Sequence, residues 1–316
     1  MLLSNKVKAY LFNILSKFMY NKFTIYLGVF HMTESNKQAL LLEQYQIKPN
    51  QALEPFIYTD ILAEYAGNHQ VNCFHFWTMK NQLILGMQDT RVNDLEKGLT
   101  SIMSNQYHPI VRNSGGLAVV ADEGVLNFSL IMPQPSEKFA ISIDNGYEFM
   151  KEVIEKALGD FKASIDAFEV SDSYCPGEFD LSIDGKKFAG ISQRRIKKGI
   201  GIMIYLSVNG NQQARGELVR DFYQASLGED FGQKNFPPVN PDSMANLSDL
   251  LKADLTVADM VTRLKKVIAT DYIISDEKQQ TFNDFLESED FKESYTFQEK
   301  RMLQRNEIIN WEALNK

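Results

Sequence analysis

The first half of the chain shows one long helical pattern followed by several short apolar runs. Asn50–Gly67 has helical spacing and ends on a glycine suited to stopping a helix. Val71–Thr78 and Gln82–Gly86 are short and apolar, which is typical of strands. Val111–Pro133 contains two further strand-like runs, joined by a turn near Asp122–Gly124. This part therefore predicts one helix and four strands.

The middle of the chain continues with a helix and a hairpin. Ser142–Leu158 carries apolar residues at helical spacing and is followed by a glycine. Phe179–Ile183 alternates apolar and polar residues, Asp184–Gly185 supplies a two-residue turn, and Lys186–Ser192 returns. Gly201–Val208 predicts one more strand.

From Glu217 onward the pattern is helical. Thr256 with Asp259, and Thr296 with Glu299, have the spacing of a capping box. The predicted helices of this region are Val257–Thr270, Glu277–Leu286 and Phe297–Ile309. Together the elements predict an α+β fold, in which a mixed, largely antiparallel sheet carries packed helices and a helical C-terminal extension follows.

The charge is unevenly distributed along the chain. Against 33 basic residues there are 41 acidic ones, a net charge of −8 that disfavours nucleic acid as a partner. Residues 1–31 hold four lysines and no acid, so we interpret them as a non-native or disordered extension preceding Met32. A basic amphipathic helix on a membrane is the alternative. Lys17 and Lys22 interrupt every apolar window long enough to span a bilayer.

The cysteines, histidines and known motifs exclude several classes of protein. Two cysteines, Cys73 and Cys175, cannot form a disulfide scaffold or a four-thiolate zinc site, and they indicate a reducing cytoplasm. The four histidines have no metal-ligand spacing, and His75 lies among phenylalanines as a structural residue would. No phosphate-binding loop, serine-hydrolase elbow or dinucleotide-binding motif is present.

Two stretches carry candidate chemistry. In Arg112–Gly116 the glycines would let the backbone approach a ligand, and Arg112 would hold a carboxylate, phosphate or carbonyl group, although a tight turn is the simpler interpretation. Cys175 stands in a loop before Pro-Gly, where a nucleophile would be accessible. Cys73 lies in an apolar strand and is expected to behave as a small hydrophobic residue.

Lys187 is the candidate partner of the Cys175 thiol. Adjacent strand residues face opposite sides, so only one of Lys186 and Lys187 can reach a given site, and the small Ala189 and Gly190 leave room for a ligand. Lys186–Lys198 contains six basic residues and no acid. This run predicts a positive face for a nucleic acid or for an acidic protein domain, or else a solvated hairpin.

Taken together, these stretches resemble the superfamily of lipoate–protein ligases and octanoyltransferases, which shares its catalytic fold with biotin–protein ligases. Val111–Pro133 is similar to the superfamily signature RRxGGGxVxHDxGxLNxS. The matching positions are Arg112, Gly115, Gly116, Val119, Asp122, Gly124, Leu126, Asn127 and Ser129. Asp180–Arg195 is similar to a second signature that contains the lysine and glycine of Lys187 and Gly190.

The resemblance implies a division of the chain and argues against one of the superfamily's reactions. After residues 1–31, it implies an N-terminal helical segment at 32–70, a catalytic domain at 71–255 and the helical extension at 256–316. Asn113, Leu117 and Ala121 replace an arginine, a glycine and a histidine of the first signature. Ligases use that neighbourhood to hold an acyl-adenylate, so activation by ATP is disfavoured.

Within the superfamily, the loop cysteine resembles that of the cysteine-using octanoyltransferases. The closest branch moves octanoyl, the precursor of lipoate, from a lysine of the glycine cleavage H protein to E2 lipoyl domains of 2-oxoacid dehydrogenases. This implies a cytoplasmic enzyme of protein lipoylation that uses no cofactor and no metal. The alternatives are transfer from octanoyl acyl carrier protein, an ATP-dependent lipoate ligase, and an inactive acyl-protein-binding module.

The resemblance also implies roles for individual residues. Cys175 would be the acyl-thioester nucleophile, and Lys187 would lower the pKa of its thiol and transfer a proton. The implied substrate-binding residues are Arg112, Ser114, Gly115, Gly116, Ala189 and Gly190.

Overall fold

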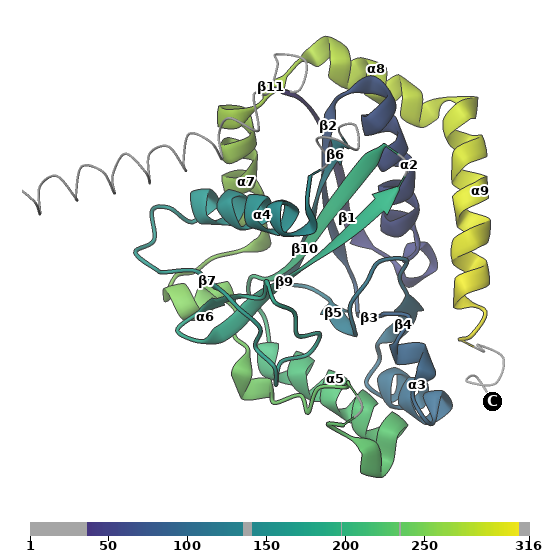
Figure 1. Cartoon of the computed structure of the whole chain (residues 1–316), viewed down its shortest axis with the longest axis vertical. Coiled ribbons are helices and arrows are strands. Elements are labelled where there is room, and N and C mark those ends of the chain that lie inside the picture. The colour runs from purple at the N-terminus through teal and green to yellow at the C-terminus, as the bar shows by residue number, and fades with distance from the viewer. Residues whose placement is uncertain (1–36, 135–140, 197, 234, 310–316) are drawn as a thin grey trace, which may run out of the picture. The chain divides into compact units, whose positions relative to one another are not determined.

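A mixed eight-stranded sheet forms the centre of the computed structural model (Figure 1). Its strand order is β11-β1-β2-β6-β10-β9-β8-β7. β11, β1 and β2 are parallel to one another, and all the other pairs are antiparallel. The strands are β1 (Gln38–Ile47), β2 (Asn72–Met79), β6 (Val125–Pro133), β7 (Asp166–Ala167), β8 (Leu181–Ile183), β9 (Lys186–Ile196), β10 (Gly199–Ser207) and β11 (Ile273–Ile274). The predicted mixed, largely antiparallel sheet is confirmed.

A second, three-stranded sheet lies beside the first and has the order β4-β3-β5. Its strands are β3 (Gln82–Leu85), β4 (His108–Val111) and β5 (Val119–Ala121). β3 pairs with β4 in parallel and with β5 in antiparallel fashion. Helices α3 (Leu95–Ser104) and α5 (Gln212–Leu227) pack on this sheet and on each other.

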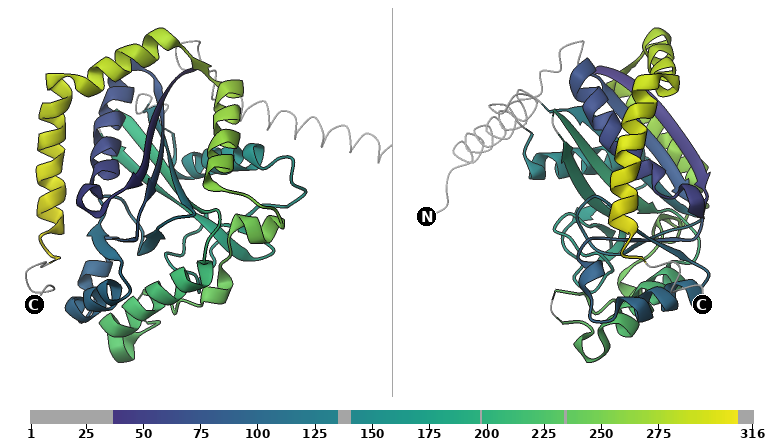
Figure 2. Two further views of the ribbon diagram at one scale, coloured as in Figure 1. Left: turned by 180° about the vertical axis from the view of Figure 1, so that it is seen from behind. Right: turned by 90° about the vertical axis from the view of Figure 1, so that its right-hand side faces the viewer.

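Helices cover both faces of the large sheet (Figure 2). On one face lies α2 (Glu54–His69), and α9 (Glu289–Asn306) packs on its outer side. On the other face lie α4 (Ile143–Ala157) and α7 (Val257–Asp271). The short α6 (Leu247–Leu251) precedes α7, and α8 (Asp276–Glu287) connects it to α9. Aromatic stacking of Phe128 with Phe74 and Phe76 fills part of the core.

The structure describes residues 37–134, 141–196, 198–233 and 235–309. The predicted N-terminal extension at residues 1–31 lies outside these ranges. Among the described residues, no helix combines the length and apolar character needed to cross a membrane.

The expected helical segment at 32–70 is wrong for its first described half. Gln38–Ile47 forms β1, which runs parallel to β2, while α2 follows it. The reason is tertiary: Ala39 and Leu40 are buried, and the strand is completed by its pairing with β2 rather than by a strong alternation of its own.

Two predicted helix boundaries also differ from the structure. α2 runs past Gly67 to His69, and Gln70 provides the left-handed end. Gly67 is instead a packing position, because a Cβ there would lie 2.7 Å from the Lys198 carbonyl oxygen. α9 begins at Glu289 with Ser288 as its cap, so Thr296 lies inside the helix. The Thr256–Asp259 capping box is confirmed.

Candidate active site

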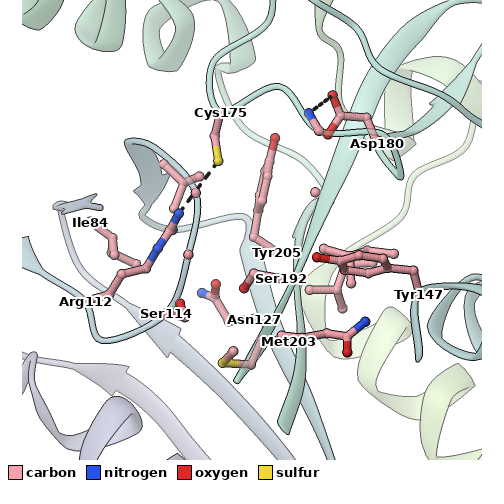
Figure 3. A pocket seen from close by; sticks show the side chains of 18 of the residues that line it. Ile84, Arg112, Ser114, Asn127, Tyr147, Cys175, Asp180, Ser192, Met203 and Tyr205 are labelled. Atoms are coloured by element: carbon pink, nitrogen blue, oxygen red, sulfur yellow. Dashed lines mark hydrogen bonds between the residues drawn. The ribbon is translucent and has the colours of Figure 1, made fainter. Parts of the chain in front are cut away.

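A cavity of about 230 Å³ lies between the two sheets (Figure 3). Its walls come from β3, β5, β6, β9 and β10, together with the loops around Arg112–Gly116 and Cys175–Gly177. In the view of Figure 3, Asn127 and Met203 lie at the end away from Cys175. Apolar and aromatic side chains form much of the wall. They are Phe56, Trp77, Ile84, Val119, Tyr147, Ile191, Met203, Ile204 and Tyr205.

The Arg112–Gly116 loop follows β4 and brings Arg112 to the cavity. The backbone N–H of Arg112 donates to the Leu85 carbonyl at 2.9 Å, which extends the β3–β4 pairing by one bond. Its guanidinium Nη2 donates to the Leu117 carbonyl at 2.7 Å. Gly116 has φ of +95°, and a Cβ there would lie 2.5 Å from Arg112 Nη2 and 2.9 Å from Cys175 Sγ. Only glycine fits at this point.

The Cys175 thiol sits directly against that loop. The Leu117 N–H donates to Sγ at 3.1 Å, and Arg112 Nη2 donates to Sγ at 3.7 Å. The side chains of Arg112 and Cys175 point toward each other in Figure 3. Cys175 is partly exposed and has φ of +48°, in the left-handed region that is costly for a residue with a Cβ. The nucleophile predicted from its loop position therefore has two donors aimed at its sulfur.

Arg112 brings a positive charge into a largely dry setting. It is buried, its Nε has no hydrogen-bond partner, and no carboxylate among the described residues lies within ion-pair distance of it. Asp89 acts on it from further away. Burial raises the pKa of Asp89 to about 6, although bonds from Tyr223 and Gly86 oppose that shift. A thiolate at Cys175 would give the buried guanidinium a nearby counter-charge.

Lys187 lies beneath the cysteine loop. Its Nζ donates to the carbonyl oxygens of Cys175 at 2.7 Å and Tyr174 at 2.9 Å, and to Ser173 Oγ at 3.2 Å. It also forms a fully buried ion pair with Asp180 at 2.9 Å. Burial raises the pKa of Asp180, with the Lys187 charge opposing the shift.

Lys187 is predicted to lie near the Cys175 thiol, and the structure places its Nζ against the backbone of the cysteine loop. Among the described contacts, Cys175 Sγ is not one of the hydrogen-bond partners of Nζ. Asp180 lines the cavity, whereas Lys187 is not among the lining residues. Lys186 is exposed while Lys187 is buried, so the predicted opposite facing of the two lysines is confirmed.

The cavity brings together most of the other predicted site residues. Ser114, Gly115, Gly116 and Gly190 line it together with Arg112. Ala189 does not line it, because it is buried in the sheet between its partners Leu181 and Leu206.

Sequence reasoning missed four polar residues of the cavity, Asn127, Asp180, Ser192 and Gln193. Asp180 stands at the start of the second signature, yet nothing in the sequence showed that Lys187 would fold back onto it. Asn127 belongs to the first signature and is buried, and its Nδ2 has no partner. Alternation along β6 could have placed Asn127 on the same face as Ser129, whose hydroxyl accepts from the Trp77 indole at 3.2 Å.

The two residues expected to be structural lie away from the cavity lining. Cys73 is buried in β2, and burial raises the pKa of its thiol. His75 is buried with Nε2 2.9 Å from Gln44 Oε1, and burial lowers its pKa to about 3. Both behave as parts of the core.

The basic run is only partly a surface. Arg194, on β9, forms an ion pair with Asp60 of α2 at 2.5 Å and donates to the Asn113 carbonyl at 2.8 Å. It therefore links the loop that follows Arg112 to α2. Arg195 donates to the Ile141 carbonyl at 2.6 Å. With Lys187 buried as well, the positive face is smaller than the sequence indicated.

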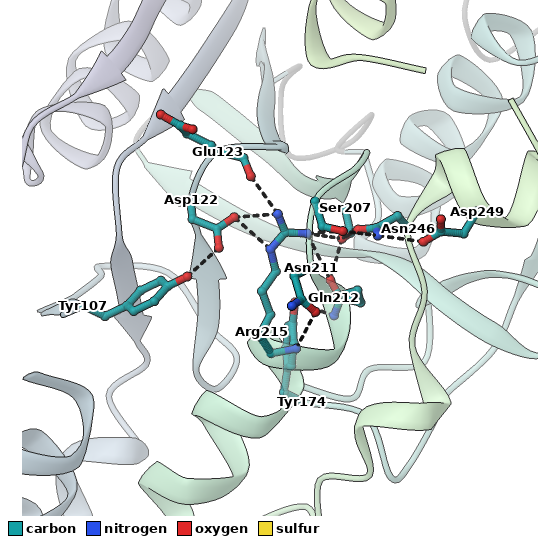
Figure 4. Close-up of polar contacts among 12 residues, drawn as sticks. Tyr107, Asp122, Glu123, Tyr174, Ser207, Asn211, Gln212, Arg215, Asn246 and Asp249 are labelled. Carbon is teal, nitrogen blue, oxygen red and sulfur yellow. Dashed lines mark hydrogen bonds and ion pairs between the residues drawn. The ribbon is translucent and has the colours of Figure 1, made fainter. Parts of the chain in front are cut away.

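A buried polar network holds the other side of the cysteine loop (Figure 4). Arg215 is fully buried, forms an ion pair with Asp122 at 2.7 Å and donates to Ser207 Oγ at 2.9 Å. Gln212 donates to the Tyr174 hydroxyl at 3.2 Å. The residue before Cys175 is thus fixed by its side chain in this network and by its carbonyl on Lys187.

Comparison with known proteins agrees with this architecture. The lipoyl protein ligase A/B catalytic domain family matches residues 49–269. An octanoyl-[GcvH]:protein N-octanoyltransferase from Exiguobacterium is 47% identical over 194 residues, 61% of this chain and 68% of its own length. A lipoyl-[GcvH]:protein N-lipoyltransferase from Listeria monocytogenes is 43% identical over 214 residues, 67% of this chain and 76% of its own.

The fold is also found among solved structures. A bi-partite lipoate protein ligase from Thermoplasma acidophilum, studied with its E2 lipoyl domain, superposes with a TM-score of 0.54 at 19% identity, covering 78% of this chain and 92% of that one. The chain therefore belongs to the lipoyl protein ligase A/B catalytic domain family. It is an enzyme, and the relatives at 43% and 47% identity are named as acyltransferases.

Proposed function

We propose that this enzyme moves an octanoyl group from the lysine of octanoylated glycine cleavage H protein to the lysine of E2 lipoyl domains. The acyl group would pass through a thioester on Cys175. The observation that carries the proposal is the pair of donors, Leu117 N–H and Arg112, aimed at a thiol in an apolar cavity. The relatives' names supply the donor protein, and the two free cysteines fit a reaction in the reducing cytoplasm.

In the resting enzyme the donors favour the thiolate of Cys175. Hydrogen bonds to an anion and a nearby cation both stabilise the charged form. The contact would also favour Arg112, because its guanidinium is buried without an adjacent carboxylate among the described residues. The two donors thus converge on the sulfur at the wall of the cavity.

In the first step the thiolate attacks the amide carbonyl carbon of the donor. A carbon–sulfur bond forms, the carbonyl oxygen becomes an oxyanion, and the carbon–nitrogen bond then breaks as the donor lysine leaves with one added proton. Leu117 N–H and Arg112 are near enough to Sγ to receive the oxyanion once sulfur has given up its charge.

The second step repeats the first in the opposite direction. The acceptor lysine loses a proton and attacks the thioester, a new carbon–nitrogen bond forms, and the thiolate is released. Substrate and product are both lysine amides, so the exchange is nearly isoergic and needs no ATP. The thioester lies uphill of both amides and should not accumulate from the H-protein donor.

We assign Lys187 two tasks. Its bonds to the Tyr174 and Cys175 carbonyls hold the left-handed backbone at Cys175, which costs about 1–2 kcal/mol unsupported. Lys187, through its ion pair with Asp180, would also give a proton to the departing donor lysine in the first step and take one from the acceptor lysine in the second. Asp180 can relay this proton because it lines the cavity.

The acyl chain would occupy the apolar part of the cavity. Val119 and Ile191 line this part, whereas Leu117 supplies its backbone N–H to Cys175 Sγ and is not among the lining residues. At about 0.8 kcal/mol per buried CH₂, six methylenes would contribute roughly 5 kcal/mol to binding.

A donor comparison tests the proposal. Octanoylated H protein, octanoyl acyl carrier protein, and free octanoate with ATP and Mg²⁺ are each offered with an apo E2 lipoyl domain, whose mass is then followed. We expect E2 octanoylation from the H protein without ATP. If only octanoyl acyl carrier protein supported transfer, the proposed donor would be wrong. If transfer required ATP, the enzyme would be a ligase and the proposed reaction would be wrong.

A further inference from the structure

The helical extension reaches the candidate active site through its last helical residue. Asn306 ends α9 and is buried. Its Oδ1 accepts from the Val111 N–H at 2.7 Å, and its Nδ2 donates to the Val111 carbonyl at 3.0 Å. Nδ2 also donates to the Met302 carbonyl at 2.9 Å, which ties the side chain to its own helix.

This contact replaces a missing strand. β4 is an edge of the small sheet, and Val111 is its last residue. The Asn306 amide meets both backbone groups of Val111, as a neighbouring strand would. The next residue is Arg112, whose N–H is bonded to Leu85 on the other side. Val111 and Arg112 are therefore hydrogen-bonded from opposite sides of the chain, at the point where the Arg112 side chain enters the cavity.

The rest of α9 packs against α2 and so holds Asn306 in place. Phe291 packs on Tyr58 with ring centroids 5.3 Å apart, and Met302 is buried. α2 in turn carries Asp60, which holds Arg194 and through it the Asn113 carbonyl. The residues on both sides of Arg112 are thus positioned by Asn306, Asp60 and Arg194, side chains that do not line the cavity.

We propose that Asn306 is a positioning residue of the active site, acting through Val111 to hold the Arg112 guanidinium beside the Cys175 thiol. The inference rests on the proposed function, in which Arg112 supports the thiolate. It makes the C-terminal extension a working part of the site. A misplacement of about 1 Å at a reacting group can cost roughly a hundredfold in rate.

The test compares Asn306→Ala with Arg112→Met and with Phe291→Leu. Phe291→Leu is the matched control, since it loosens α9 at its other end without contacting β4. For each protein we measure the melting temperature, the pH profile of Cys175 alkylation by iodoacetamide, and kcat and KM for transfer between octanoyl-H protein and E2 domain.

We expect Asn306→Ala to lower kcat by about ten- to a hundredfold with KM nearly unchanged, and to move the alkylation profile to higher pH, as Arg112→Met does. Phe291→Leu should lower the melting temperature without moving the profile. Asn306→Asp keeps the acceptor for the Val111 N–H but places a carboxylate against the Val111 carbonyl, so it should resemble Asn306→Ala.

Two outcomes separate this inference from the proposed function. If Arg112→Met moves the alkylation profile and Asn306→Ala does not, the positioning role is wrong while the thiolate account stands. If both move it but no donor supports E2 acylation, the proposed reaction fails and the positioning role survives. An Asn306→Ala effect no larger than that of Phe291→Leu would also overturn the role.

Discussion

At the scale of single residues, the account depends on how one thiol is charged and held. In the proposed reaction Cys175 carries the acyl group, and two cations lie on different sides of it. Arg112 faces its sulfur, whereas Lys187 faces its backbone carbonyl. The two side chains should therefore give separable effects, one on thiolate formation and one on the loop.

Arg112→Met should slow alkylation of Cys175 at neutral pH by about tenfold and move the alkylation profile to higher pH. The physical reason is loss of the only cation whose contact with Sγ is found among the described residues. Arg112→Lys should fall between, because lysine keeps the charge but loses the planar fork that also bonds the Leu117 carbonyl. An unchanged profile in both variants would assign the thiolate to another group.

Lys187→Met should destabilise the folded protein by about 3–5 kcal/mol in denaturant titrations. It leaves Asp180 as a buried charge without its partner. Adding Asp180→Asn should restore much of that stability without restoring transfer. Lys186→Met is the matched control: this lysine is exposed, so its loss should stay within about 0.5 kcal/mol. Normal turnover in the double variant would remove the pair from the reaction.

At the scale of elements, the loops that carry Gly86, Gly116 and Cys175 pack closely against one another at the site. Gly86 and Gly116 meet so closely that a Cβ on Gly86 would lie 1.8 Å from the Gly116 carbonyl oxygen. Gly116 in turn faces both Arg112 and Cys175. Gly116 of the first signature, and Gly86 packed against it, are thus packing requirements of the cysteine site.

Gly116→Ala should reduce transfer by at least a hundredfold. Its Cβ would push Arg112 and Cys175 apart, and its φ of +95° is unfavourable for alanine. Gly115→Ala should cost much less, since no atom lies within 4 Å of a Cβ there. Steady-state rates of E2 acylation, with circular dichroism as a check on folding, decide between these outcomes. Equal losses in the two variants would contradict the packing argument.

Elements with a strong local pattern could be predicted from the sequence, and those completed by distant partners could not. The β8–β9 hairpin follows from Asp184–Gly185, both of which have positive φ. β1 was missed because its partner β2 lies beyond a whole helix. The same holds for the site. The loop position of Cys175 could be predicted from the sequence. The contact between Arg112 and its sulfur could not, because it depends on how the two sheets are arranged.

At the scale of the whole molecule, buried titratable groups link folding to pH. Burial lowers the pKa of His75 to about 3, so the unfolded chain binds more protons between about pH 3 and 6.5. The contribution of His75 to the free energy of unfolding is therefore fully present above about pH 6.5 and is lost as the pH falls towards 3. Asp89, with its pKa raised to about 6, acts with the opposite sign between about pH 4 and 6.

The difference between wild type and His75→Gln isolates the histidine. Glutamine keeps a donor for Gln44, and it does not titrate. The stability advantage of the wild type should shrink by up to about 1.4 kcal/mol per unit as the pH falls below 6.5. Denaturant titrations at several pH values measure it. A gap that stays constant with pH would show that His75 does not titrate on unfolding.

The central claim, that the acyl group passes through Cys175, is tested most directly by intact-protein mass spectrometry. The enzyme is mixed with an activated octanoyl donor such as octanoyl acyl carrier protein, without ATP, and apo E2 domain is then added. Wild type and Cys73→Ala should each gain one octanoyl mass, which then moves to E2, whereas Cys175→Ser should neither gain nor transfer it. Transfer to E2 by Cys175→Ser at a rate close to that of the wild type would contradict the account.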